Sequence, residues 1–345
     1  MNFLLASLLA LNIPQIATDS PNRQPQLAAA NGTVALVFGS GHSILLAQSH
    51  DNGASFSSPV TVAEPGALAL GRHRGPRVVI SRKALLVSAA AGDTAASDLL
   101  LWRSMDAGKS WSKAIRVNDV PTSAREGLHA MAADGNGHVA AVWLDLRDGT
   151  MRLYGAYSAD EGATWSKNFL VYHAPDGPIC QCCHPSLVAT ANGAFAAMFR
   201  NCLDGNRDLY LIHLRNGRVA SAAEKLGTGS WKLNACPMDG GALAFSVGRI
   251  ITAWRRGTDL FLAEPGKPET RIGDGADIAL TVSGGKTYAV WTRGGALEAM
   301  IDGKVETLAP AGAYPSVTAL PWGGALAAWE SSGIIQIIHL LDNQH

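Results

Sequence analysis

The sequence contains few charged residues and no excess of either sign. Asp, Glu, Lys and Arg together make up 16% of the chain, and 28 basic residues balance 28 acidic ones. A protein that binds nucleic acid or an anionic membrane surface through its overall field carries a net positive charge. We therefore expect neither of these partners.

The sequence also lacks long apolar runs. No segment reaches the roughly 18 apolar residues of a membrane-spanning helix, so we expect no membrane span. Residues 3–11 form an apolar stretch as long as a secretory signal core, but no Lys or Arg precedes it and no A-x-A cleavage site follows. Two interpretations stay open. In the first, residues 1–17 are a signal peptide and the protein is exported to the periplasm or the extracellular space. In the second, residues 13–18 form a strand of the fold. In either case residues 18–345 form the main domain.

Glycine and proline, by contrast, are plentiful, with 37 and 16 residues, as is typical of many short strands joined by tight turns. A short apolar strand recurs seven times, with copies that begin at residues 32, 83, 137, 193, 248, 285 and 324. Each copy follows another short strand, and the spacing of roughly 50 residues early and under 40 late is typical of four-stranded propeller blades. We predict an all-β fold with a single β-propeller of seven blades. The last blade lacks a fourth strand, and residues 13–18 are the candidate for it unless they belong to the signal peptide.

Three segments share the pattern S-x-D-x-G-x-[ST]-[FW], at residues 49–56, 104–111 and 158–165. This pattern predicts a β-turn. The Asp accepts hydrogen bonds from the backbone of its own turn, the Gly supplies a positive φ, and the aromatic ring packs between strands. One copy is a weak signal, but three copies are specific.

With these turns the chain resembles the Asp-box, or BNR-repeat, proteins of the sialidase superfamily, over at least residues 20–170. In that family the boxes are structural turns on the propeller face away from the active site. The resemblance therefore implies a fold and gives Asp51, Asp106 and Asp160 no chemical role. Sialidases of that family have six blades, so six is the alternative to the seven counted from the repeats.

The stretch ICQCCHPS at residues 180–187 holds three of the five cysteines. The predicted topology brings all five to one part of the top face, the face opposite the Asp boxes. Disulfides are one outcome, with one thiol left over. A soft-metal site is the other, and compact thiolates favour copper, whereas C-x-C-C differs from the usual zinc knuckle. The candidate ligands to copper or zinc are Cys180, Cys182, Cys183, His184, Cys202 and Cys236, with Met238 as a further donor.

The resemblance also implies candidate catalytic residues. Exo-sialidases place an arginine triad, an aspartate acid/base, and a tyrosine nucleophile paired with a glutamate at the propeller centre. The segment RQP at 23–25 resembles the start of the family's first blade, and YPS at 314–316 resembles its tyrosine segment. The implied residues are Arg23, Arg255 and Arg293 for the triad, Tyr314 as nucleophile and Glu330 as its partner.

Three functions follow as hypotheses. The first is an exported sialidase-like propeller that binds a small-molecule or glycan ligand on its top face, beside the cysteine loop. The second is a glycoside hydrolase of the exo-sialidase type. The third is a non-catalytic interaction scaffold stapled by disulfides, because the propeller fold does not fix a function.

Overall fold

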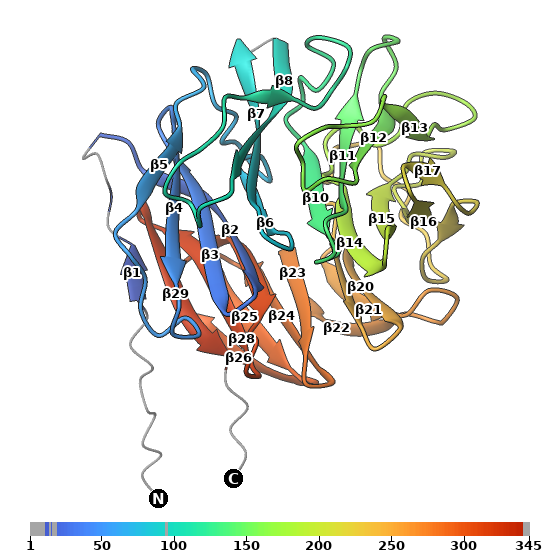
Figure 1. Cartoon of the computed structure of the whole chain (residues 1–345). Helices are drawn as coiled ribbons and strands as arrows, with labels where there is room; N and C mark the ends of the chain where they lie inside the picture. Colours follow the sequence, from blue (N-terminus) through green and yellow to red (C-terminus); the bar gives the residue numbers. More distant parts are fainter. Residues whose placement is uncertain (1–10, 14, 16–18, 94–95, 341–345) are drawn as a thin grey trace, which may run out of the picture.

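A computed structural model describes residues 11–13, 15, 19–93 and 96–340, and these residues form strands and loops arranged as a propeller. Seven antiparallel sheets stand in a ring (Figure 1). Their innermost strands line a central cavity, here called the tunnel. The prediction of one all-β propeller with seven blades is confirmed. The described part of the chain has no helix that is long and apolar enough to cross a membrane.

The first three blades each use four consecutive strands, counted from the tunnel outward. They are β2 (Asn22–Ala30), β3 (Thr33–Ser40), β4 (Ser43–Ser49) and β5 (Val60–Ala63); β6 (Arg77–Ile80), β7 (Leu85–Asp93), β8 (Ala96–Ser104) and β9 (Ile115–Arg116); and β10 (His129–Ala133), β11 (Val139–Asp145), β12 (Arg152–Ser158) and β13 (Phe169–Tyr172).

The next three blades follow the same order, and blade four has an additional strand, β18, which pairs with β16. They are β14 (Ser186–Ala191), β15 (Ala194–Arg200), β16 (Leu209–Arg215), β17 (Arg218–Val219) and β18 (Glu224–Lys225); β19 (Ala242–Ser246), β20 (Arg249–Arg256), β21 (Asp259–Ala263) and β22 (Thr270–Asp274); and β23 (Ala276–Ser283), β24 (Lys286–Arg293), β25 (Ala296–Ile301) and β26 (Lys304–Ala309).

Blade seven joins the two ends of the chain. Its strands β27 (Ala313–Ala319), β28 (Ala325–Ser331) and β29 (Ile334–Leu340) are completed by β1 (Leu11–Ile13), which pairs antiparallel with β29. Ile13 is 5% exposed and belongs to the core between blades seven and one. The candidate closing strand spans residues 13–18, and only residue 13 of it lies in β1. Residues 14 and 16–18 lie outside the described residues. The same is true of residues 1–10, which belong to the possible signal peptide. The pairing of β1 with β29 covers residues 335–337 of the outer edge of β29.

The core lies between neighbouring blades. The second strand of most blades is covered on both faces, and this explains why the repeat detected in the sequence is a continuous apolar run. An aromatic ring stands near the end of several of these strands, and Trp143, Trp291 and Trp329 are almost completely buried. Packing between neighbouring blades therefore explains why the same apolar strand recurs in the sequence.

The three Asp-box segments have the same hydrogen bonds. In the first, Ser49 Oγ donates to Asp51 Oδ1 over 2.7 Å, and Gly53 N donates to Ser49 Oγ over 2.8 Å. The equivalent Ser–Asp bonds at 104–106 and 158–160 are 2.8 Å long. Each segment lies between the third and fourth strands of its blade. Because successive strands are antiparallel, this places the segments on the face opposite to the loops that begin the blades.

Candidate functional site

The innermost strands of all seven blades line a cavity of about 620 Å³ along the propeller axis. Small apolar side chains make up most of its wall. Polar side chains gather at the top end, where the chain begins each blade. These residues are Gln24, His73, His184, Asp277 and Tyr314.

Three of these polar residues occupy the same strained position in different blades. Gln24, Asp277 and Tyr314 have φ values of +54°, +60° and +51°, and each lies where a β-bulge interrupts the pairing of an inner strand. Such a conformation costs about 1–3 kcal/mol for a residue with a side chain, and bulges redirect side chains near functional sites. The three bulges turn these side chains toward the mouth of the tunnel.

A loop at residues 71–75, here called the hub loop, crosses this mouth. It begins blade two, yet Arg72 Nη2 and His73 Nε2 lie 2.6 and 2.7 Å from Oδ1 of Asp277 in blade six. The His73 ring stacks on His184 of blade four, with centroids 4.2 Å apart, and meets the ring edge of Tyr314 of blade seven. The hub loop therefore connects loops that are distant around the ring.

Asp277 is held as a carboxylate. Burial alone would raise the pKa of Asp277, but the hydrogen bond and charge of His73 and the charge of Arg72 hold it well below the usual range. Thr292 Oγ1 also donates to Asp277 Oδ2, and the Asp277 backbone N–H donates to Asp239 over 3.0 Å. An ionised, fully partnered carboxylate is unsuited to donate a proton, so Asp277 organises the mouth.

Arg255 supports this arrangement from outside the tunnel. Its Nε lies 3.3 Å from Oδ2 of the buried Asp239, which in turn accepts the backbone N–H of Asp277. Arg255 also donates to the carbonyl of Pro237. It does not line the cavity. The structure thus places Arg255 behind Asp277.

The structure brings Arg23, Tyr314 and Glu330 together. Arg23 Nη1 lies 3.6 Å from Glu330 Oε1, and the backbone N–H of Gln24 donates to Glu330 Oε2 over 3.0 Å. Burial raises the pKa of Tyr314, and the charges of Asp277 and Glu330 raise it further, against the opposing charges of Arg72 and Arg23. The phenol therefore lies within the field of two guanidinium groups and two carboxyl groups.

These five residues are the mouth cluster: Arg23, Arg72, Asp277, Tyr314 and Glu330. Burial also raises the pKa of Glu330, with only partial compensation from the backbone of Gln24 and the charge of Arg23.

Arg293 lies away from the mouth cluster. It forms an ion pair with Asp274 in which the two side chains are 57% and 42% exposed, and it does not line the cavity.

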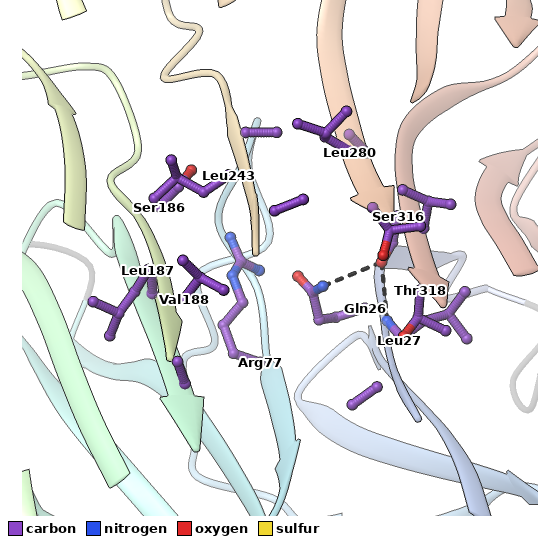
Figure 2. Close-up of a pocket in the computed structure, with 18 of the residues that line it drawn as sticks. Gln26, Leu27, Arg77, Ser186, Leu187, Val188, Leu243, Leu280, Ser316 and Thr318 are labelled. Carbon is purple, nitrogen blue, oxygen red and sulfur yellow. Dashed lines mark hydrogen bonds between the residues drawn. The ribbon is translucent and has the colours of Figure 1, made fainter. Parts of the chain in front are cut away.

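Arg77 is a site residue that the sequence did not single out. It stands on β6 with its guanidinium inside the tunnel, between Val188 and Gln26 (Figure 2). It donates to the carbonyl of His73 over 2.8 Å and to those of Gly75 and Pro76.

Burial lowers the pKa of Arg77 to about 10. The Arg77 side chain makes no ion pair within the part of the chain that the structure describes. It holds the hub loop from below and adds one uncompensated positive charge. The signal in the sequence was an arginine at the start of an otherwise apolar inner strand.

His184 faces the tunnel and not the cysteines. Its Nδ1 accepts the backbone N–H of Gly240 over 3.3 Å, and its Nε2 lies 3.1 Å from the carbonyl oxygen of Gly241. Burial, with the nearby charges of His73 and Arg77, lowers the pKa of His184 well below its usual value. The ring is therefore neutral, and both of its nitrogens are used in hydrogen bonds.

Three sulfur atoms form a compact group beside this histidine. The sulfurs of Cys180, Cys182 and Cys183 all lie within 4.8 Å of one another, with 3.2 Å between Cys180 and Cys183 and 3.8 Å between Cys180 and Cys182. Hydrogen bonds with the other two thiols lower the pKa of Cys180 to about 3, whereas burial raises the pKa of Cys183 to about 12.

The other two cysteines differ in their exposure. Cys236 is exposed. Cys202 is half-buried, and its backbone N–H bonds to the Asn201 side chain. All five cysteines are free thiols in the structure, and the three-sulfur group includes neither Cys202 nor Cys236. Met238 has a φ of +54° in the loop that carries Cys236.

No protein-family model matches the sequence. No curated protein matches it either. Solved structures match along almost the whole chain. One is an ulvan lyase bound to -[GlcA(1-4)Rha3S]-, with a TM-score of 0.60, 10% identity and 96% of each chain covered.

Another match is the α-L-arabinanase of Penicillium chrysogenum complexed with arabinobiose, with a TM-score of 0.58, 12% identity, and 96% of this chain and 97% of that chain covered. A third is the α-L-arabinofuranosidase of Fusarium graminearum in complex with an iminosugar inhibitor, with a TM-score of 0.51, 12% identity and the same coverage. At these identities the likeness concerns the fold alone. These matches agree with the predicted β-propeller fold.

Proposed function

We propose that this protein is an exported, sialidase-like β-propeller that binds a carboxylate-bearing glycan at the mouth of its tunnel. The observation that carries the proposal is the position of Tyr314. A bulge with positive φ holds its phenol between the Arg23–Glu330 pair and the Arg72–Asp277 pair. Strain of this kind persists where the surroundings enforce it, and it concentrates at binding sites.

The charges at the mouth favour an anionic ligand. The opposite charges cancel within the Arg72–Asp277 pair and within the Arg255–Asp239 pair. Burial disfavours the charged form of Glu330. Arg77 then leaves an excess of positive charge. Arg23 is 48% exposed, so its guanidinium can meet a carboxylate with two parallel hydrogen bonds.

The size of the cavity and the ligands of the matching propeller structures support a saccharide as the ligand. A volume of about 620 Å³ falls within the usual range of small-molecule sites. Two of the matching propellers were solved with saccharides, and one of these contains GlcA, a sugar acid. Export rests on the apolar stretch at residues 3–11.

Exo-sialidase activity is the second candidate function. It is favoured by the grouping of Tyr314 with Glu330 and Arg23, which matches the set implied by the family resemblance. A phenol with a raised pKa needs a base to become a nucleophile. Glu330 is the carboxyl group positioned to serve, and turnover of a fluorogenic sialoside tests this function.

The cysteine loop adds a soft-metal site, for copper or zinc, beside the ligand site. Its three clustered thiols support this proposal, because thiolates select soft ions. The disulfide-stapled scaffold is the alternative. A disulfide requires a sulfur–sulfur distance of about 2.05 Å, so Cys180 and Cys183, at 3.2 Å, would have to move closer to form one.

Calorimetric titration with acidic and neutral oligosaccharides tests the proposed function. We expect binding of sialate- or uronate-terminated ligands, weak or no binding of neutral ones, and at least about tenfold weaker binding by Arg23→Ala, since each 1.4 kcal/mol is tenfold. Arg293→Ala is the matched control, because Arg293 is also a half-exposed, ion-paired arginine. Equal binding of neutral ligands, or equal effects of the two substitutions, would contradict the proposal.

A further inference from the structure

Three thiols of the loop at residues 180–183 lie together. Cys182 is half-buried, with its sulfur 3.8 Å from that of Cys180, and Cys180 and Cys183 are 0% and 2% exposed. We propose that Cys180, Cys182 and Cys183 bind one monovalent copper ion as a three-coordinate site. This deepens the soft-metal part of the proposed function and does not depend on glycan binding.

The three sulfurs are already close to the geometry of a shared ion. Sulfurs bound to one ion at about 2.3 Å lie about 3.8–4.0 Å apart. Cys180 and Cys182 have a separation of 3.8 Å, and the Cys180–Cys183 distance of 3.2 Å needs to increase by less than 1 Å. Each Cu–S bond that forms replaces an S–H bond, so binding releases the remaining thiol protons and changes no oxidation state.

The number of donors selects copper over zinc. Structural zinc almost always has four ligands in a tetrahedron. His184 cannot be the fourth without giving up its bonds to Gly240 and Gly241. No Asp or Glu joins the three-sulfur group among the described residues. Soft thiolates suit Cu(I), which accepts three ligands readily.

Arg200 compensates the negative charge of the bound thiolates. It is 2% exposed and donates to the carbonyls of Asp239, Arg207 and Arg255. It forms no ion pair with a carboxylate in the described residues, and its charge acts on Cys180 and Cys183. A buried cation without an acid is costly, and a thiolate–copper centre supplies the missing negative charge.

Titration of the reduced, metal-free full-length protein with chelator-buffered Cu(I), in the absence of oxygen, tests the proposal. We expect one Cu(I) per chain, three Cu–S distances by X-ray absorption, and no stoichiometric zinc in a parallel titration. Preferential binding of zinc, a copper site with two or four sulfurs, or no copper binding by the fully reduced chain would each overturn it.

Single substitutions separate the roles of the thiols. Cys182→Ser, at a half-buried position, should weaken Cu(I) binding by more than about tenfold. Cys202→Ser is the matched control and should change nothing. Cys236→Ser is a second control and should keep one three-sulfur copper per chain, because Cys236 is not part of the three-sulfur group. A lost sulfur ligand in either control, or unchanged Cu(I) binding by Cys182→Ser, would contradict the proposal.

The copper and glycan experiments give independent results. Loss of copper binding with acidic-glycan binding intact would remove only this inference. Copper binding without glycan binding would leave this inference standing and remove the proposed ligand site.

Discussion

His73 and Asp277 are 204 positions apart in the chain, yet Nε2 of His73 lies 2.7 Å from Oδ1 of Asp277. This contact connects blade two to blade six across the mouth of the tunnel, and it places the hub loop over the cavity. Arg72 reinforces it through the same carboxylate oxygen. The shape of the proposed ligand site therefore depends on Asp277.

Replacement of this carboxylate should destabilise the protein. Asp277→Asn removes the charged partner of Arg72 and His73 in a mostly buried position, so we expect a loss of about 3 kcal/mol in the free energy of unfolding. Asp274→Asn is the control, because its exposed pair with Arg293 should contribute less than about 1 kcal/mol. Urea unfolding of both variants measures the difference. Equal losses would show that the hub loop does not depend on Asp277.

Acid should destabilise the fold in part through His129. This residue is 1% exposed, and burial together with the charge of Arg77 lowers its pKa from 6.5 to about 3. The unfolded chain therefore takes up a proton as the pH falls below about 6.5 while the folded chain does not, so stability is lost in the acid direction. Unfolding measured between pH 7 and pH 4 should show a shallower loss for His129→Gln than for wild type. The exposed His50→Gln should retain the full loss, and a profile for His129→Gln parallel to wild type would refute this assignment.

The enzymatic alternative depends on the hydroxyl group of Tyr314. If the protein hydrolyses a fluorogenic sialoside, Tyr314→Phe should abolish turnover, because phenyl cannot act as a nucleophile. Folding should be retained, since no hydrogen bond of the phenol holds the described structure together. Tyr288→Phe, in a second strand away from the mouth, serves as the control. Full turnover by Tyr314→Phe would exclude the tyrosine mechanism.

The N-terminal strand sets a limit on processing. Because Leu11–Ile13 pairs with β29, cleavage after residue 17 would remove β1 from the fold. A chain that begins at residue 18 should unfold at lower temperature and associate through the open edge of β29, whereas one that begins at residue 11 should not. Mass spectrometry of the exported protein and thermal unfolding of the two truncations check this. Equal stability of the two would show that β1 is dispensable.

The repeated parts of the fold could be predicted from the sequence because they depend on local chemistry. The turn at 49–56 needs only its own Ser, Asp and Gly, and the apolar second strands follow from cover on both faces. The mouth of the tunnel is different, because the reach of the hub loop from blade two to Asp277 depends on loop shape. Neither periodicity nor turn chemistry contains that information.

In the cysteine loop, too, one feature could be predicted from the sequence and another could not. The proximity of Cys180, Cys182 and Cys183 follows from their positions in the chain. The direction of His184 could not be predicted in this way. Cys182 lies in a turn and Cys183 in a bend, so strand alternation does not apply, and the bonds of the His184 ring to Gly240 and Gly241 hold it toward the tunnel.

A crystal structure of the protein with an acidic oligosaccharide would locate the proposed binding site. We expect the sugar at the top mouth of the tunnel, in contact with Tyr314, with its carboxylate within hydrogen-bond distance of Arg23 or Arg72. A saccharide bound on the Asp-box face, or at the mouth with its carboxylate turned away from both arginines, would contradict the proposal.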